Sequence, residues 1–275
     1  MNLTVNVLTL FPEMFGEVIE SSILGRAGQR GILDVRVVNI RDYSTNKHLK
    51  TDDYPFGGGA GMVMMAQPVF DALSAMGVHG QSYSGDESGP HDRRRMIYMS
   101  PRGRLLDGKL ATELAAEKEI VILCGHYEGM DQRVLYHFHF EEVSIGDYIL
   151  TGGELPAMVL IDTVARLLPE ALGNQEAHAE ESIYSGLLEY PQYTRPASFA
   201  FGTTTLDVPG VLISGNHKEI RLWNFRQSLD LTMHIRPDLF RAFAENPPEN
   251  LLKEERIILD EYCEVFLKSQ KHGAL

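Results

Sequence analysis

Three glycine-rich clusters carry the residues best suited to holding a ligand. They are FGGGAGM (residues 56–62), CGHYEG (124–129) and SIGDYILTGGE (144–154). The second and third clusters include or follow short apolar runs that predict strands. In open α/β sheets, ligands bind beyond the carboxyl ends of the strands, where glycine lets the backbone approach them closely. The clusters therefore indicate a ligand site at one edge of a sheet.

The clusters do not match familiar phosphate-binding or hydrolase motifs. The first lacks the Lys-Ser/Thr pair of a P-loop, and Phe11-Pro12 follows the first predicted strand in place of a dinucleotide-binding glycine pattern. Cys124 ends an apolar run and is expected to be a small buried side chain. A zinc site is disfavoured because no cysteine or carboxylate lies at a recognised ligand spacing from His126, His137 and His139.

The elements that must position these clusters alternate between strands and helices. Apolar patterns predict strands at residues 3–8, 33–40, 95–100, 119–124 and 138–145, and Pro101-Arg102-Gly103 is expected to end the third. Helical patterns cover residues 11–24, 67–76, 107–118, 130–136 and 154–168. A polar surface loop is expected at 77–95. The alternation predicts an α/β fold with a parallel sheet covered on both faces.

The pattern changes in the last third of the chain. Apolar periodicity fades after about residue 170, and helical spacing takes over at 216–233, 237–244 and 248–268. We therefore expect an α/β domain over residues 1–170 and a smaller, mostly helical domain over 187–275. Residues 171–186 have the composition of an interdomain linker.

Composition limits the class of protein. The 275 residues are 44% hydrophobic and carry a net charge of −13, which is globular and argues against a nonspecific nucleic-acid coat. A polyanionic partner must therefore find local basic patches. Two cysteines, no apolar run of membrane-spanning length and no secretory signal predict a cytoplasmic protein with no membrane partner.

Several long blocks resemble one family in order along nearly the whole chain. The sequence is similar to the bacterial tRNA (guanine-N1)-methyltransferases, the TrmD group of the SPOUT superfamily. The blocks are KHLKTDDYPFGGGAGMVM (47–64), SPRG (100–103), CGHYEGMDQRV (124–134), SIGDYILTGGELPAM (144–158), GLLEYPQYTRP (186–196) and SGNHKEIRLW (214–223). The resemblance implies methylation of N1 of the guanosine immediately 3′ of the anticodon in tRNA.

The resemblance also implies a fold and a cofactor. SPOUT domains contain a deep trefoil knot, which is an exception to the rule that chains do not thread through loops. The resemblance implies S-adenosylmethionine as the methyl donor and a homodimer with composite active sites. The donor-binding positions carry over to Tyr98, Ser100, Pro101, Gly125, Ser144, Ile145, Gly146, Asp147, Tyr148, Ile149, Leu150, Gly152 and Gly153.

Methylation of guanine N1 requires a group that takes the N1 proton and a cation that stabilises charge on the base. In the family pattern an Asp of the interdomain linker is the base, and an Arg at the end of the preceding helix assists. Arg166 matches the Arg, and the Asp position falls on Glu181. Glu181 keeps the carboxylate but adds a methylene, and the neighbouring Glu180 is the alternative base.

Other residues are candidates for contact with tRNA. The resemblance places Glu128 near the target base, and Tyr127 beside it could pack against the donor or the base. Lys218, Arg221 and Arg226 lie on one predicted helix with aromatic side chains between them, a pattern that suits phosphate contact and stacking. The structural alternative for Glu128 is a carboxylate at the start of a helix. For the helix, the alternative is that Trp223 and Phe225 are core aromatic side chains flanked by solvated basic ones.

Two other functions remain open from the sequence. The replacement of the family's Asp by Glu181 would fit a noncatalytic tRNA-binding module. A SPOUT enzyme acting on ribosomal RNA is a second alternative, which the helical C-terminal domain and its GLLEYPQYTRP lead-in oppose. The sequence leaves open the choice of tRNA isoacceptor and whether Mg²⁺ takes part.

Overall fold

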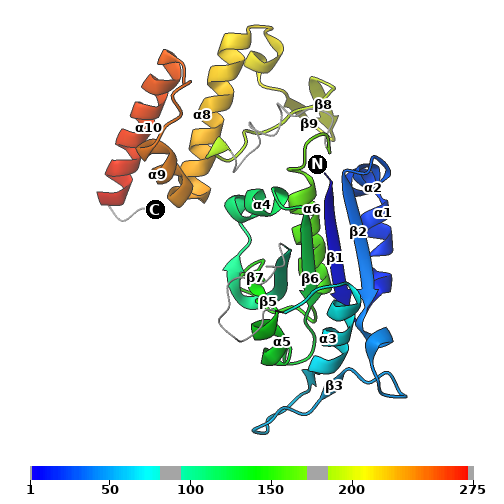
Figure 1. Ribbon diagram of the computed structural model, residues 1–275. Coiled ribbons are helices and arrows are strands. Elements are labelled where there is room, and N and C mark those ends of the chain that lie inside the picture. Colours follow the sequence, from blue (N-terminus) through cyan, green and yellow to red (C-terminus); the bar gives the residue numbers. More distant parts are fainter. Residues whose placement is uncertain (1, 81–93, 172–184, 272–275) are drawn as a thin grey trace. The chain divides into compact units, whose positions relative to one another are not determined.

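The computed structural model describes residues 2–80, 94–171 and 185–271. The chain divides into two compact units, residues 1–175 and 176–275, and each is described here by itself (Figure 1). Most of the predicted linker lies outside the described residues, as does most of the predicted loop at 77–95.

A five-stranded sheet forms the centre of the first unit. Its strands are β1 (Leu3–Thr9), β2 (Leu33–Asn39), β5 (Arg95–Leu105), β6 (Glu119–Cys124) and β7 (Glu141–Ser144). They are all parallel, in the order β2-β1-β6-β5-β7. This confirms the predicted α/β fold with a parallel sheet.

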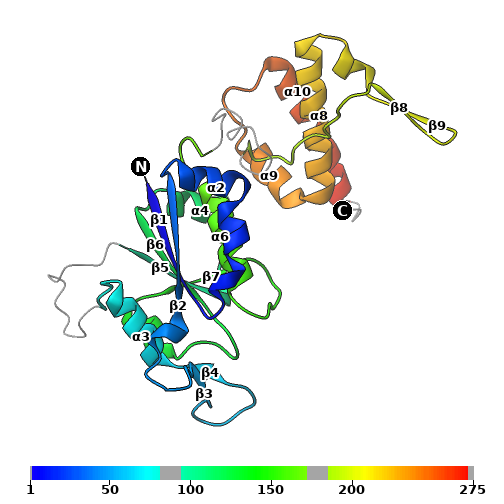
Figure 2. The ribbon, with the colours of Figure 1, turned by 90° about the vertical axis from the view of Figure 1, so that its right-hand side faces the viewer.

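Helices cover both faces of this sheet (Figure 2). One face packs against α1 (Gly16–Glu20), α2 (Ser22–Gln29), α4 (Gly108–Ala115) and α6 (Glu154–Ala165), and the other against α3 (Ala66–Ala75) and α5 (Gln132–His137). Alternate residues of β6 therefore enter two different cores. This is why EIVILC reads as a continuous apolar run rather than as an alternating one.

The first predicted helix, at residues 11–24, is wrong as a single helix. The chain forms a 3₁₀ turn (Pro12–Met14), then α1 and α2, because Ser21 is extended and Ser22 has a φ of +52°. The bend is tight, since a Cβ atom at Gly25 would overlap the backbone of Glu20. Glycine at this position allows the two short helices to pack at the bend.

The predicted end of the third strand at Pro101 is also wrong. β5 continues to Leu105, and its pairing with β7 jumps from Met99 to Arg104. Residues 100–103 thus form an irregularity outside the ladder, where proline's missing N–H removes no strand-pairing hydrogen bond.

The first glycine cluster lies in a small hairpin beside the sheet. β3 (Asp52–Asp53) pairs antiparallel with β4 (Val63–Met64), and residues 57–61 lie in the connection between them (Figure 2). Met64 also forms a parallel bridge with Met130. The hairpin is thereby attached to the chain segment that follows β6.

The second unit is built on three helices, α8 (His217–Ile235), α9 (Pro237–Glu245) and α10 (Lys253–Lys271). Their apolar faces form one core around residues such as Leu229, Phe240, Phe243 and Phe266. No helix within the described parts of the chain is long and apolar enough to cross a membrane.

A β-hairpin precedes these helices, and the sequence analysis did not predict it. β8 (Ser198–Phe201) pairs with β9 (Thr204–Asp207) around Gly202, whose φ is +61° (Figure 2). All eight strand residues are exposed, and a short 3₁₀ helix (Gly210–Ile213) follows. The interval between the linker and the first helical pattern is therefore partly strand.

Candidate functional site

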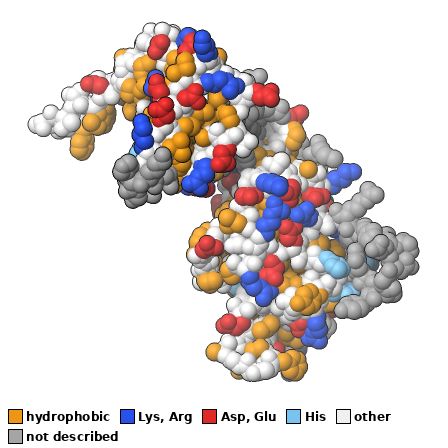
Figure 3. All heavy atoms as spheres, turned by 90° about the vertical axis from the view of Figure 1, so that its left-hand side faces the viewer, with side chains coloured by type: hydrophobic (Ala, Val, Ile, Leu, Met, Phe, Trp, Pro, Cys, Tyr) orange, Lys and Arg blue, Asp and Glu red, His pale blue; other side chains and the backbone are white. Residues whose placement is uncertain are grey.

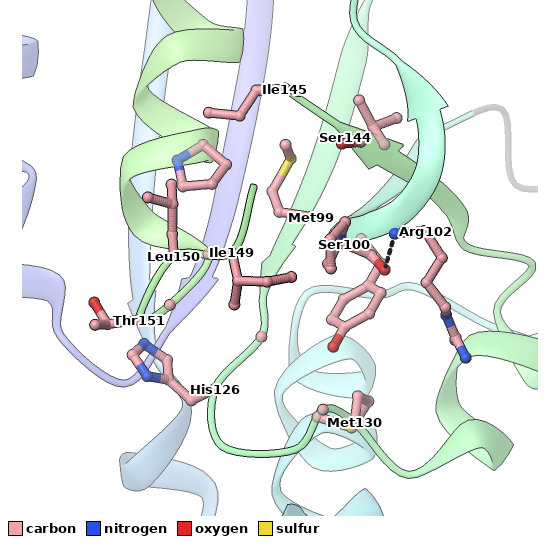
Figure 4. A pocket seen from close by; sticks show the side chains of 18 of the residues that line it. Met99, Ser100, Arg102, His126, Met130, Ser144, Ile145, Ile149, Leu150 and Thr151 are labelled. Atoms are coloured by element: carbon pink, nitrogen blue, oxygen red, sulfur yellow. Dashed lines mark hydrogen bonds between the residues drawn. The ribbon is translucent and has the colours of Figure 1, made fainter. Parts of the chain in front are cut away.

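A cavity of about 390 Å³ opens at the carboxyl ends of β5, β6 and β7 (Figure 4). Three segments form most of its lining, residues 98–102, 125–130 and most of 143–153, and Gln132, Leu135 and Pro156 complete it. Two of the three glycine clusters therefore meet at one site, while the first cluster does not line it. Because the strands are parallel, their carboxyl ends share one edge of the sheet, and this brings together segments far apart in the chain.

The cavity brings together nearly all of the residues expected to bind the donor. Those that line it are Tyr98, Ser100, Pro101, Gly125, Ser144, Ile145, Gly146, Tyr148, Ile149, Leu150, Gly152 and Gly153. Asp147 differs, because it lies exposed at the tip of a turn that the Tyr148 N–H closes on the Gly146 carbonyl at 2.9 Å. The binding roles of these residues remain predictions.

Three glycines allow the cavity segments to pack in close contact. A Cβ atom on Gly125 would lie 2.5 Å from the Tyr98 hydroxyl, and one on Gly153 would lie 2.7 Å from the backbone of Cys124. One on Gly152 would overlap the His126 imidazole. The Gly153 N–H donates to the Gly125 carbonyl at 2.8 Å, so the two glycine loops are joined directly.

A buried carboxylate lies behind this junction. Glu154, at the start of α6, is 2% exposed and accepts a hydrogen bond from the Thr9 hydroxyl at 2.6 Å. Its other oxygen lies 2.6 Å from Nε2 of His126, whose ring packs against Phe11 with centroids 4.9 Å apart. Glu154 thus connects the end of β1, the loop after β6 and α6, and it holds His126 at the cavity wall.

The loop after β6 carries backbone strain next to the cavity. Tyr127 has a φ of +59°, which is rare for a bulky side chain, and Gly129 has a φ of +125°. Tyr127 and Glu128 are exposed and line the cavity. Unusual backbone conformations persist where surrounding contacts hold them, as they do at many ligand sites.

At the opposite wall, Arg102 forms two hydrogen bonds with Glu142, at 2.8 and 2.9 Å. Burial alone would raise the pKa of Glu142, but hydrogen bonds from Arg102 and Ser100 outweigh it and lower the pKa. Burial is also the main reason why the pKa of Tyr98 is raised.

Cys124 is completely buried, and burial raises the pKa of its thiol well above the ordinary value. A thiol held in the protonated form is a poor nucleophile and a poor metal ligand. The expectation of a small buried side chain is confirmed. Within the described residues, no group of three or more His, Cys, Asp and Glu side chains could hold a metal ion.

Of the candidate catalytic residues, the structure describes only Arg166, which lies far from this cavity within its own unit. Arg166 is the C-cap of α6, whereas Gly153 and Pro156, at the beginning of that helix, line the cavity. Twelve residues at about 1.5 Å each separate the two ends by roughly 18 Å. Glu180 and Glu181 lie outside the described residues.

The predicted basic residues of the second unit all have acidic neighbours. Lys218, Arg221 and Arg226 on α8 form ion pairs with Glu254, Glu255 and Glu261 of α10, respectively. The view in Figure 3 shows basic and acidic side chains interspersed on this unit. These cations join two helices, so RNA phosphates would have to compete with carboxylates for them. Their contact with tRNA remains a prediction.

Sequence reasoning missed Thr9, and it gave Glu154 no role beyond its place in the third cluster. The signal available for Glu154 was a carboxylate directly after two glycines and before the apolar run LPAMVLI. A charged residue at the start of such a buried helix needs a polar partner. Its partners lie 145 and 28 residues away, and their pairing depends on the folded sheet.

The first unit is an open α/β domain whose cavity lies at the carboxyl ends of parallel strands, where such domains usually bind ligands. The chain belongs to the tRNA (guanine-1)-methyltransferase TrmD family, whose model matches residues 3–242. The resemblance found in the sequence is confirmed, and the protein is an enzyme. Nothing in the comparisons favours a noncatalytic module or an enzyme of ribosomal RNA.

Similar proteins cover most of the chain. The tRNA (guanine-N(1)-)-methyltransferase of Ruminiclostridium cellulolyticum is 51% identical over 90% of this chain and 99% of its own length. That of Moorella thermoacetica is 49% identical over 91% of this chain and 95% of its own. The tRNA (guanine-N(1)-)-methyltransferase of Staphylococcus epidermidis is 45% identical over 94% of this chain and 96% of its own length.

Proposed function

We propose that this protein methylates N1 of the guanosine immediately 3′ of the anticodon in tRNA, with S-adenosylmethionine as donor. The observation that carries the proposal is the glycine-lined cavity at the strand ends of a chain belonging to the tRNA (guanine-1)-methyltransferase family. The cavity fits a small organic ligand, because Gly125, Gly152 and Gly153 leave room that side chains would fill.

S-adenosylmethionine supplies an electrophilic methyl group when it is bound. The residues that would hold it are the cavity-lining residues of the second and third glycine clusters and of the segment 98–101. The chain must then hold the guanine in line and accept the N1 proton. We assign proton acceptance to Glu181, charge stabilisation to Arg166 and contact with the guanine edge to Glu128, with Tyr127 packing beside it.

The position of Arg166 supports a homodimer with composite sites. Arg166 lies at the far end of α6 from its own cavity, so we assign its role at each cavity to the Arg166 of a second copy. α6 presents exposed apolar side chains one turn apart, Leu155 and Val159, and the neighbouring loop exposes Ile149. Exposed apolar groups of this kind favour burial against a second copy.

The remaining parts of the proposal concern topology and partners. We propose that residues 145–153 take part in a trefoil knot; their close packing against residues 124–125 supports this. The unit from 187 onward is assigned to tRNA binding, and the enzyme is assigned to the cytoplasm, where tRNA is found.

The decisive experiment is methyl transfer to tRNA followed by mapping of the modified atom. The full chain is incubated with methyl-labelled S-adenosylmethionine and tRNA transcripts carrying guanosine immediately 3′ of the anticodon. We expect label on N1 of that guanosine, and none on transcripts with adenosine there. Label at another atom, or on ribosomal RNA alone, would contradict the proposal.

The donor site can be tested separately from the reaction. Gly152→Val places a side chain where the His126 imidazole and the Glu154 carboxylate lie, so calorimetric binding of S-adenosylmethionine should be lost. Gly210→Val is the control, since no atom outside its immediate neighbours lies within 4 Å of a Cβ at that position. Undiminished binding by Gly152→Val would remove the third glycine cluster from the donor site.

A further inference from the structure

The first glycine cluster has no role in the donor cavity, yet it is attached to the loop that carries Glu128. The Glu128 N–H donates to the Met62 carbonyl at 2.9 Å, and the Met64 N–H donates to the Gly129 carbonyl at 2.9 Å. The Asp131 N–H donates to the Met64 carbonyl at 3.0 Å. β4 therefore pairs with β3 on one side and with the loop that carries Glu128 on the other. Because the glycine cluster ends just before β4, its last residues are held next to Glu128.

Gly61 leaves the space that the Glu128 side chain occupies. A Cβ atom on Gly61 would lie 2.5 Å from both Cγ and Oε1 of Glu128, far inside van der Waals contact. Gly61 also has a φ of +91°, a conformation that glycine adopts readily. Within the described parts of the chain, the Glu128 carboxylate has no hydrogen bond or ion pair, so packing against Gly61 restricts where it can lie.

We propose that Gly61 is a positioning residue for the reaction: its missing side chain lets the Glu128 carboxylate lie where it meets the guanine edge. The inference rests on the proposed contact between Glu128 and guanine. Gly61 itself touches no reacting atom. Of the first glycine cluster, Gly61 thus serves the substrate side of the site through Glu128.

The exposure of Glu128 makes this inference testable. Its carboxylate is the far end of a flexible, exposed side chain. A methyl group at position 61 should therefore displace the carboxylate without disrupting the fold. Misplacement of a catalytic group by about 1 Å can reduce a rate about 10²-fold. We expect Gly61→Ala to slow single-turnover methyl transfer by about 10- to 100-fold while donor binding is unchanged.

Gly57 provides a closely matched control in the same loop. Its φ is +87°, so alanine there suffers nearly the same backbone strain as at Gly61. No atom outside its immediate neighbours lies within 4 Å of a Cβ at Gly57. Gly57→Ala should therefore transfer methyl groups within a few-fold of the unmodified enzyme. The difference between the two variants isolates the contact with Glu128 from strain in the loop.

A double-mutant cycle identifies Glu128 as the route of the effect. Glu128→Ala removes the carboxylate, so adding Gly61→Ala should cause no further loss of rate. The rates of the two single variants, the double variant and Gly57→Ala are measured with saturating S-adenosylmethionine and tRNA. Calorimetric donor binding and thermal unfolding are recorded for each protein.

Each outcome decides the inference. If Glu128→Ala is slow but Gly61→Ala matches Gly57→Ala, the role of Gly61 is wrong and that of Glu128 stands. If the two losses add in the double variant, Gly61 acts through another group. If Gly61→Ala alone loses donor binding or its fold, the side chain at 61 disturbs more than Glu128. A normal rate for Glu128→Ala overturns the guanine contact itself.

Discussion

Glu154 joins three parts of the first unit through one carboxylate. Glu154 is the first residue of α6. It accepts a hydrogen bond from the hydroxyl of Thr9, at the end of β1, and its other oxygen contacts His126, in the loop after β6. Buried polar groups are stable when each has a partner, and removing one partner leaves the others unsatisfied. This carboxylate therefore stabilises both the fold and the wall of the cavity.

Replacing Glu154 should destabilise the protein measurably. Glu154→Ala leaves the Thr9 hydroxyl and the His126 ring without their buried acceptor, at about 1–3 kcal/mol for each unsatisfied group. Urea unfolding should show this loss in the free energy of unfolding. Glu113→Ala is the control, because Glu113 pairs with Arg104 at the surface, where both side chains are partly exposed, and its removal should have little effect. Equal stability of the two variants would contradict the structural role of Glu154.

The proton acceptor is tested by substitutions in the linker. Glu181→Gln keeps the size of the side chain but cannot accept the N1 proton, so single-turnover methyl transfer should fall by about 10²–10⁴-fold. Glu181→Asp restores the family residue and should remain active. Donor binding should persist in both. If Glu180→Gln is slow and Glu181→Gln is normal, the base is Glu180.

At the scale of elements, the irregular pairing of β5 and β7 forms one wall of the cavity. The two strands pair on both sides of residues 100–103, and Arg102 reaches back to Glu142 on β7. The hydrogen bonds of Arg102 fasten this segment at the place where Ser100 and Pro101 line the cavity.

The Arg102–Glu142 pair should give stability a pH dependence. The pKa of Glu142 is lowered in the folded protein, so its ionised form stabilises the fold above its ordinary value of 4.5. That stabilisation is lost as the pH falls through the folded pKa. The stability difference between the protein and Glu142→Gln should shrink below pH 4.5 in urea unfolding. A difference that does not vary with pH would rule out this contribution.

The sequence predicted the elements whose patterns are local. β6 has a continuous apolar run, and α8 begins where Asn216 caps it through the N–H of Glu219. The second and third glycine clusters were predictable site segments, because both follow strands. The pairing that extends β5, and the contact of Gly61 with Glu128, depend on segments 39 and 67 residues away, respectively. Local patterns carry no information about such distant partners.

Two strands were also beyond local prediction. SFAF and TTLD are short and lie beside proline and glycine, so their pattern is also typical of a loop. The break between α1 and α2 had no glycine or proline at Ser21 or Ser22 to mark it.

At the scale of the whole molecule, α6 separates Arg166 from the cavity of its own chain. If the active site is composite, an Arg166→Ala chain and a Gly152→Val chain should complement each other. Differently tagged chains are mixed, and heterodimers are isolated before the assay. Each heterodimer retains one site with both functions, so methyl transfer should reappear although each parent homodimer is inactive. No recovery in verified heterodimers would show that each chain acts alone.

The exposed β8–β9 hairpin has a consequence for amide hydrogen exchange. Among the residues that the structure describes, no third strand pairs with it, and Phe199, Phe201 and Leu206 share one exposed face. An isolated two-stranded hairpin is marginally stable in water. Its amides should exchange with deuterium by local opening, long before those of β1, which is hydrogen-bonded between two neighbouring strands. In the same spectrum, the hairpin then reports local fluctuations, while β1 reports unfolding of its whole unit.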